Sequence, residues 1–153
     1  MRQRILPVIG CVLLFFVIDL PAQTGDTGLG VRLGEPTGIS AKIMTRSSRS
    51  MNFAAAWSLG SESRLVLQGD YVFYDNDILN LDIDRGTLPL YYGLGVHLKL
   101  ADEPEIGVRV PLGVNLFFSE NPLGIFFEIA PTLQLVPATR IDLYGGIGVH
   151  YYF

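Results

Sequence analysis

Long stretches of alternating residues fill the second half of this chain. The alternation runs through residues 88–100, 105–118, 124–136 and 139–153, where nearly every second residue is aliphatic or aromatic and the others mix glycine, tyrosine and charge. A period of two places successive side chains on opposite faces of a β-strand. Strands of globular proteins usually have about 5–6 residues, whereas a tilted strand needs about 9–11 residues to cross a membrane. The pattern therefore predicts four long strands, each with one apolar face.

Shorter alternating segments in the first half complete the set. They cover residues 27–34, 37–44, 50–60 and 63–75, and turn-rich pieces such as GEP, TRSSR, ADEP and SENP separate the eight segments. We find no helical period after residue 22. The sequence therefore predicts an all-β fold, an eight-stranded antiparallel up-and-down transmembrane β-barrel preceded by a signal peptide.

Composition bears on which face of the barrel meets the surroundings. Charged residues make up only 17% of the chain, and its mean hydropathy is +0.36. Hydrocarbon offers no water to unpaired backbone groups, so a sheet crosses it only when it is closed. We therefore expect the apolar face to contact lipid and the mixed face to line the lumen. The alternative is a soluble periplasmic barrel of the lipocalin type, with its apolar face inward.

The N-terminus has the parts of a secretory signal peptide. The basic start MRQR precedes the apolar run LPVIGCVLLFFVI, and Ala22 offers a small residue for cleavage. A membrane anchor and lipidation of Cys11, the single cysteine, are weaker interpretations. We expect a signal peptide over 1–22, an outer-membrane barrel domain over 23–153, and export through the inner membrane. The formal charge of −4, without a basic stripe, argues against a nucleic-acid partner.

Charged residues on the mixed face predict a polar network in the lumen. An eight-stranded barrel is just wide enough for side chains to fill, and buried charges are tolerated when they are paired. We therefore expect a salt-bridged plug rather than a pore, with Lys99 near Glu105 and Asn115 near Glu128. The predicted lumen residues are Arg32, Lys42, Asp70, His97, Lys99, Glu105, Arg109, Asn115, Glu128, Asp142 and His150.

Catalytic and cofactor signals are weak. His97 and His150 fall near opposite ends of the barrel, so they cannot share a metal ion. Glu128 is expected close to His150 across the last hairpin, a pair suited to acid–base chemistry, but a lumen hydrogen bond is the simpler interpretation because no nucleophile is near. The glycines of GLGVRLG do not match the dinucleotide spacing. We predict no catalytic residue, no cofactor and no metal.

Several stretches resemble a known family. The segments GVRLGEPTGISAKI, LPLYYGLGVHLKL, GVRVPLGVN and IFFEIAPTLQLVPAT, followed by GIGVHYYF, resemble an uncharacterised family of small bacterial outer-membrane β-barrel proteins filed as a domain of unknown function. More broadly the chain is similar to OmpA-like eight-stranded transmembrane barrels. The resemblance implies that Val149, Tyr151 and Phe153 form a signal read by the barrel-assembly machinery. It also implies outer-membrane lipid as a partner, and it assigns no activity or ligand. We expect a monomer with a structural or surface-interaction role.

Two prolines suggest a different function. Pro111 and Pro131 fall almost opposite each other on the sixth and seventh expected strands, and neither can donate a ladder hydrogen bond. A lateral seam there would suit a lipid-modifying or lipid-binding barrel, a device similar to that of the outer-membrane palmitoyltransferase of lipid A. A β-bulge that sets barrel curvature is the simpler interpretation.

Overall fold

The computed structural model describes residues 26–58, 64–79, 84 and 86–153, and the expected signal peptide lies outside these ranges. All regular elements in the described part are strands, and none of its residues form a helix long and apolar enough to cross a membrane. The strands are β1 Thr27–Gly34, β2 Gly38–Arg46, β3 Arg49–Ser58, β4 Arg64–Asp75, β5 Gly86–Thr87, β6 Leu90–Leu100, β7 Glu105–Arg109, β8 Leu112–Phe118, β9 Leu123–Val136 and β10 Arg140–Tyr152.

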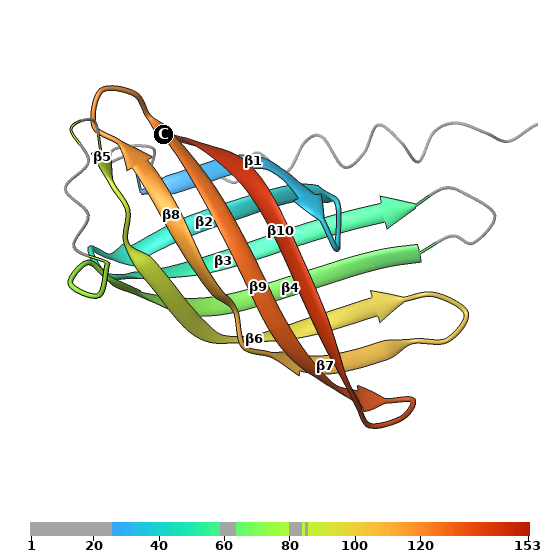
Figure 1. The fold of residues 1–153 in the computed structure, drawn as a ribbon. Coiled ribbons are helices and arrows are strands. Elements are labelled where there is room, and N and C mark those ends of the chain that lie inside the picture. Colours follow the sequence, from blue (N-terminus) through green and yellow to red (C-terminus); the bar gives the residue numbers. More distant parts are fainter. Residues whose placement is uncertain (1–25, 59–63, 80–83, 85) are drawn as a thin grey trace, which may run out of the picture.

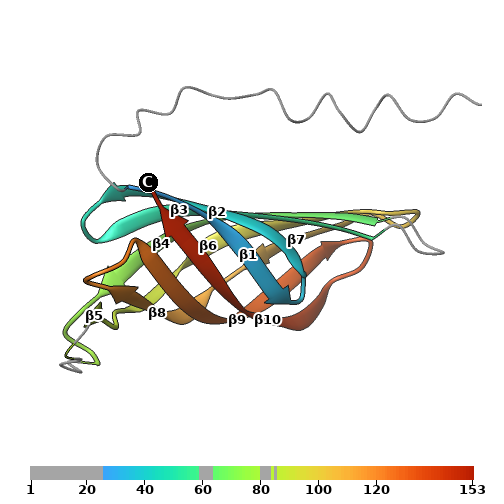
Figure 2. The ribbon, with the colours of Figure 1, turned by 90° about the horizontal axis from the view of Figure 1, so that it is seen from above.

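The strands close into a ring of eight positions, all antiparallel. Each strand pairs with its neighbours in the ring, and β10 pairs with both β9 and β1, which closes the sheet (Figure 1). Figure 2 shows β10 running beside β1 from above. Because each ring strand has a partner on both sides, the sheet has no long free edge.

The strand count differs from the expected eight at two places. The sixth expected strand is divided into β7 and β8 around Val110 and Pro111, because a proline cannot donate a ladder hydrogen bond, and β6 pairs with both halves. The two-residue strand β5 lies in the connection after β4 and pairs with β8. The described residues therefore form ten strands but the predicted eight ring positions.

The hairpin connections gather at two ends of the barrel. The β1–β2, β6–β7 and β9–β10 connections lie at one end, whereas the C-terminus, β5 and the β8–β9 connection lie at the other (Figure 1). The longest connection between ring strands, residues 76–89, belongs to the end that carries the C-terminus.

The barrel is polar inside and apolar outside. Strand β9 alternates between exposed and buried residues over most of its length, with Ile125, Phe127 and Ile129 outward and Glu128 inward. Among the described residues, 14 polar or charged side chains are buried, against eight hydrophobic ones. The lipocalin-type alternative required the aliphatic face inward, so this arrangement does not support it.

A small aromatic cluster fills the interior toward the end that carries the C-terminus. Val72, Tyr74, Tyr91 and Phe126 form the buried hydrophobic cluster, with Phe117 packed against it. The ring of Tyr74 lies 5.6 Å from that of Tyr91 and 6.0 Å from that of Phe117. The charged residues of the lumen therefore lie against a wall of aromatic rings.

Candidate functional site: a charged network inside the barrel

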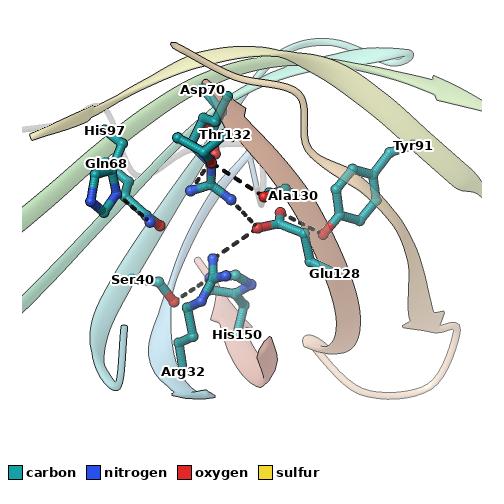
Figure 3. Close-up of polar contacts among 11 residues, drawn as sticks. Arg32, Ser40, Gln68, Asp70, Tyr91, His97, Glu128, Ala130, Thr132 and His150 are labelled. Atoms are coloured by element: carbon teal, nitrogen blue, oxygen red, sulfur yellow. Dashed lines mark hydrogen bonds and ion pairs between the residues drawn. The ribbon is translucent and has the colours of Figure 1, made fainter. Parts of the chain in front are cut away.

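Glu128 on β9 is the centre of the interior network. Its Oε1 accepts hydrogen bonds from Arg32 Nη1 at 2.9 Å and from Arg109 Nη2 at 2.6 Å, and its Oε2 accepts one from the Tyr91 hydroxyl at 2.9 Å (Figure 3). The donors come from β1, β7 and β6, so one carboxylate joins four ring strands. The Arg32, Arg109 and Glu128 side chains are at most 4% exposed.

Asp70 on β4 extends the network on the other side of Arg109. Arg109 Nη1 lies 3.4 Å from Asp70 Oδ2, and the Arg109 side chain is fully buried. Arg109 therefore lies between two carboxylates from opposite parts of the ring. A buried cation in this position is stabilised only because both acidic partners are present.

Glycines make room for these long side chains. Asp70 pairs across the ladder with Gly95, and Glu128 pairs with Gly146. A Cβ atom at Gly95 would collide with the Asp70 carboxylate, and one at Gly146 would lie 2.7 Å from Arg32 Nε. The alternation of glycine with charge on the mixed face is thus a packing requirement of the narrow lumen.

Lys42 on β2 has a different environment from the other buried cations. Its Nζ lies 5.3–5.8 Å from the ring centroids of Tyr74, Tyr91, Phe117 and Phe126. These distances are those of cation–π contacts. Lys42 is 1% exposed, and its Nζ has no hydrogen-bond partner among the described residues.

The two histidines lie apart, and each has its own partners. His150 Nε2 is hydrogen-bonded to Ser40 Oγ at 2.8 Å, and the His150 ring stacks on Phe126. His97 Nδ1 is hydrogen-bonded to Gln68 Nε2 at 3.1 Å, and its ring stacks on Tyr144. No group of three or more potential metal ligands occurs in the described part of the chain.

The prediction that Glu128 lies close to His150 across the last hairpin is wrong, because β9 and β10 pair in a different register. Glu128 pairs with Gly146, whereas His150 pairs with Gly124, four residues before Glu128 in β9. Glu128 is directed to Arg32 and Arg109, and His150 to Ser40. The arrangement is one of structural hydrogen bonds and not of an acid–base pair.

A second cluster lies at the end opposite the C-terminus. Lys99 Nζ donates to Glu105 Oε1 at 2.8 Å, as the sequence suggests, and Arg140 donates to Glu105 at 3.1 Å and to Asp142 at 2.8 Å. Lys99, Arg140 and Asp142 are partly exposed and Glu105 is buried, and Lys99, Glu105 and Arg140 line an open cup of about 530 Å³. Lys99, Glu105 and Asp142 thus belong to the rim and not to the central network.

Asn115 and Glu128, expected near each other to within about two residues across the β8–β9 hairpin, are offset by two residues. Asn115 pairs with Phe126 across β8 and β9, and Glu128 pairs there with Gly113. Both Asn115 and Glu128 are buried in the interior. The two residues share the lumen, but their backbone positions are not opposite each other.

Several interior partners were not predicted. Four of them are hydrogen-bonded to predicted lumen residues: Tyr91 to Glu128, Ser40 to His150, Gln68 to His97 and Arg140 to Glu105. The fifth is Gln134, whose Nε2 donates to the hydroxyl of Tyr144 at 3.0 Å, and Tyr144 was not predicted either. All of them lie on the polar face of their strands, so the alternation was a signal that could have found them. Tyr91, Ser40, Gln68 and Gln134 are neutral and were missed because the search concentrated on charged side chains, whereas Arg140 is charged and was missed although it lies on the same face of β10 as Asp142.

The paired strands stay in register at Pro111 and Pro131, where a lateral seam was considered. Arg109 pairs with Thr132 and Leu112 with Ile129, so each strand has two residues between these pairs. Val110 N donates to Pro131 O at 2.9 Å and Gly93 N donates to Pro111 O at 3.0 Å, so each proline still accepts a ladder bond. The expected bulge at the prolines is misplaced, because the register shift lies between Ile106 and Gly107.

The C-terminal residues lie on the outer wall. Val149, Tyr151 and Phe153 are 39–50% exposed and share the apolar face of β10. Phe153 N donates to Thr27 O at 2.9 Å, which ties the end of the chain to β1. The terminal aromatic residue is therefore positioned where the ring closes.

Comparison with known proteins supports the fold and leaves the family open. No protein-family model matches the chain, so the resemblance to an uncharacterised barrel family gains no support, and no curated protein matches it in sequence. Its structure is similar to the crystal structure of the N-terminal β-barrel domain of Pseudomonas aeruginosa OprF, with a TM-score of 0.53 and 11% identity. The match covers 83% of this chain and 94% of that domain. The chain therefore has the fold of a small OmpA-like β-barrel.

Proposed function

We propose that this chain is a monomeric, non-enzymatic barrel of the bacterial outer membrane, with a structural or surface-interaction role and a lumen closed by salt bridges. The observation that carries the proposal is the inverted distribution of polarity. Large apolar side chains such as Leu94, Leu143 and Phe127 are 54–67% exposed on the outer wall, whereas Arg109 and Lys42 are buried. Lipid accepts such a wall, and water does not.

The outer aromatic residues support the membrane position. Phe73 stacks on Tyr92 at 6.0 Å, and Tyr151 contacts Phe153 edge-on at 5.1 Å, all on the outer face toward the end that carries the C-terminus. Aromatic residues are enriched at membrane interfaces because one part of the ring system is apolar and another tolerates water. We place this end of the barrel at the periplasmic interface.

The interior network supports a closed lumen. Glu128 connects four ring strands through Arg32, Arg109 and Tyr91, and the cavity beside it measures only about 20 Å³. The opposite end opens into the larger cup, but the network lies below it. With side chains filling an eight-stranded barrel, no continuous water path is expected.

Assembly and export complete the proposal. The leader over 1–22 directs the chain through the inner membrane, and the face bearing Val149, Tyr151 and Phe153 is recognised by the barrel-assembly machinery. Short connections at the far end, such as residues 101–104, leave a compact surface whose main concavity is the cup. The surface partner, if the role is interaction, would contact this end.

The first experiment compares unboiled and boiled samples of the outer-membrane fraction on an SDS gel. A closed barrel resists SDS until heated because no strand is free to peel from an edge. We expect a mobility shift on boiling and recovery with the outer membrane. Recovery in the soluble fraction without detergent, and with no shift, would refute the membrane proposal.

A further inference from the structure

The buried interior of the barrel carries an unbalanced charge. Apart from the groups at the rim, it holds the cations Arg32, Lys42 and Arg109 and the carboxylates Asp70 and Glu128, all at most 7% exposed. Glu128 is paired with Arg32 and Arg109, and Asp70 lies beside Arg109. Lys42 belongs to none of the ion pairs of the described residues. Three cations and two carboxylates leave one positive charge without a counterion.

Lys42 is the residue with this surplus charge. Aromatic rings surround its Nζ, and cation–π contacts stabilise an ammonium only in part. The desolvation of a buried ammonium costs more free energy than such contacts supply. The rings alone therefore do not offset the desolvation of this charge, and a nearby negative charge would.

A small cavity lies next to Lys42. Its volume is about 20 Å³, and its walls include Arg32, Lys42 and His150 together with the acidic residues Asp70 and Glu128. A cavity of this size holds about one water molecule or one small ion. It is too small for sulfate, phosphate or a carboxylate-bearing metabolite, so the size restricts the ligand to a single-atom anion or water.

Hydrogen-bond donors exceed acceptors around this cavity. Arg32 Nε, Arg32 Nη2 and Lys42 Nζ are buried without a hydrogen-bond partner among the described residues. On the accepting side, the unpartnered atoms are Asp70 Oδ1 and, when Nε2 carries the proton, His150 Nδ1, whereas both Glu128 oxygens are already occupied. A ligand that only accepts hydrogen bonds matches this set better than water, which also brings two donors.

We propose that this cavity binds one halide-sized anion, chloride under physiological conditions, held by Lys42 and Arg32. The anion supplies the missing negative charge and accepts the unused N–H groups. It converts a network with a surplus cation into a neutral one, which is the arrangement a low-dielectric interior tolerates. The inference goes beyond the proposed function, because it concerns the interior and holds whichever solvent surrounds the wall.

Bromide substitution tests the site directly. The full-length protein, folded in detergent micelles in sodium bromide, is crystallised, and anomalous scattering is measured at the bromine edge. We expect one peak between Lys42 and Arg32, and none in crystals grown in sodium gluconate. Crystals grown in bromide that show no anomalous peak there would overturn the proposal and assign the cavity to water or to an uncharged Lys42.

A solution experiment gives a second readout. The midpoint of urea unfolding is measured in chloride and in gluconate at one ionic strength, because a ligand that binds only the folded state raises stability with its concentration. We expect the wild-type midpoint to rise with chloride. Equal midpoints in the two salts across a hundredfold range of chloride would contradict a bound anion.

A matched pair of variants locates the effect. Lys42→Met removes the surplus cation, and Lys99→Met removes the only other lysine, at the rim. We expect Lys42→Met to lose the chloride dependence and Lys99→Met to retain it. Chloride dependence retained by Lys42→Met would overturn the site assignment. If Lys42→Met does not fold, the bromide experiment on the wild type decides.

Discussion

Glu128 is the residue on which most of the interior depends. Its carboxylate is the shared acceptor of two buried arginines and the Tyr91 hydroxyl. Breaking a buried ion pair by removing one partner leaves an uncompensated charge and is much costlier than the net worth of the pair. Stability in this barrel is therefore concentrated at one side chain.

The substitution Glu128→Gln tests this dependence. It keeps the side-chain volume but leaves Arg32 without a carboxylate and Arg109 with Asp70 alone, so we expect a loss of about 3–5 kcal/mol in the free energy of unfolding. Urea unfolding in micelles, followed by the fluorescence of Trp57, the only tryptophan, measures it. Glu103→Gln, at an exposed position in the β6–β7 connection, is the control and should change stability by less than about 0.5 kcal/mol. Equal effects of the two variants would contradict the network.

Gly95 offers a steric test on the same strand ladder. A Cβ atom at Gly95 would collide with the Asp70 carboxylate and approach Gly69 O, whereas a Cβ atom at Gly69 would make ordinary contacts of 3.7–4.0 Å. We expect Gly95→Ala to destabilise the barrel by about 1–3 kcal/mol, as overpacking does. Gly69→Ala should be close to neutral. The two unfolding midpoints are compared in the same detergent, and an equal loss would show that the lumen is less crowded than described.

At the scale of the element, the junction of β7 and β8 decides whether the barrel has a lateral opening. The backbone amides of Val110 and Gly93 donate to the carbonyls of Pro131 and Pro111, so the ladder continues through the prolines. We expect these two amides to exchange with deuterium as slowly as those of β9, measured by NMR in micelles. Fast exchange confined to Val110 and Gly93 would support the lateral seam and the lipid-modifying alternative.

At the end of the C-terminal strand, recognition by the barrel-assembly machinery can be tested separately from the stability of the folded barrel. Phe153 is half exposed on the outer wall, so removing its ring leaves the interior network intact. We expect Phe153→Ser to reduce the amount of assembled barrel in cells several-fold while refolding in detergent stays unchanged. Phe153→Trp keeps an aromatic end and should assemble normally. An equal loss in cells and in refolding would indicate a purely structural role for this residue.

At the scale of the whole molecule, the interior network predicts a barrel that conducts no ions. The wild-type protein in a planar lipid bilayer should give no steady conductance above the bare-bilayer level, because side chains fill the eight-stranded lumen. A matched preparation of a known open porin provides the positive control. Reproducible open-channel steps from the wild-type protein would contradict the closed lumen.

The sequence predicted the local features of this barrel well. The period of two assigned each strand and its polar face, and β9, β10 and β6 begin and end within two residues of the expected bounds, because alternation is a property of the neighbouring residues alone. Pro111 also indicated where the ladder weakens. The count of ten strands was not predicted, because β5 depends on its pairing with β8.

Only the tertiary structure decided which polar side chains meet. Arg32 and Glu128 are 96 residues apart in sequence, and their contact depends on ring closure through β10 and on the relative shift of strands around the barrel. The expected Glu128–His150 pair failed for a more local reason: β9 and β10 are paired directly, and the register of that one hairpin places Glu128 opposite Gly146 and His150 opposite Gly124. Sequence alternation fixes the face on which a side chain lies, whereas its height in the barrel, and hence its partner, follows from register summed over all the strands.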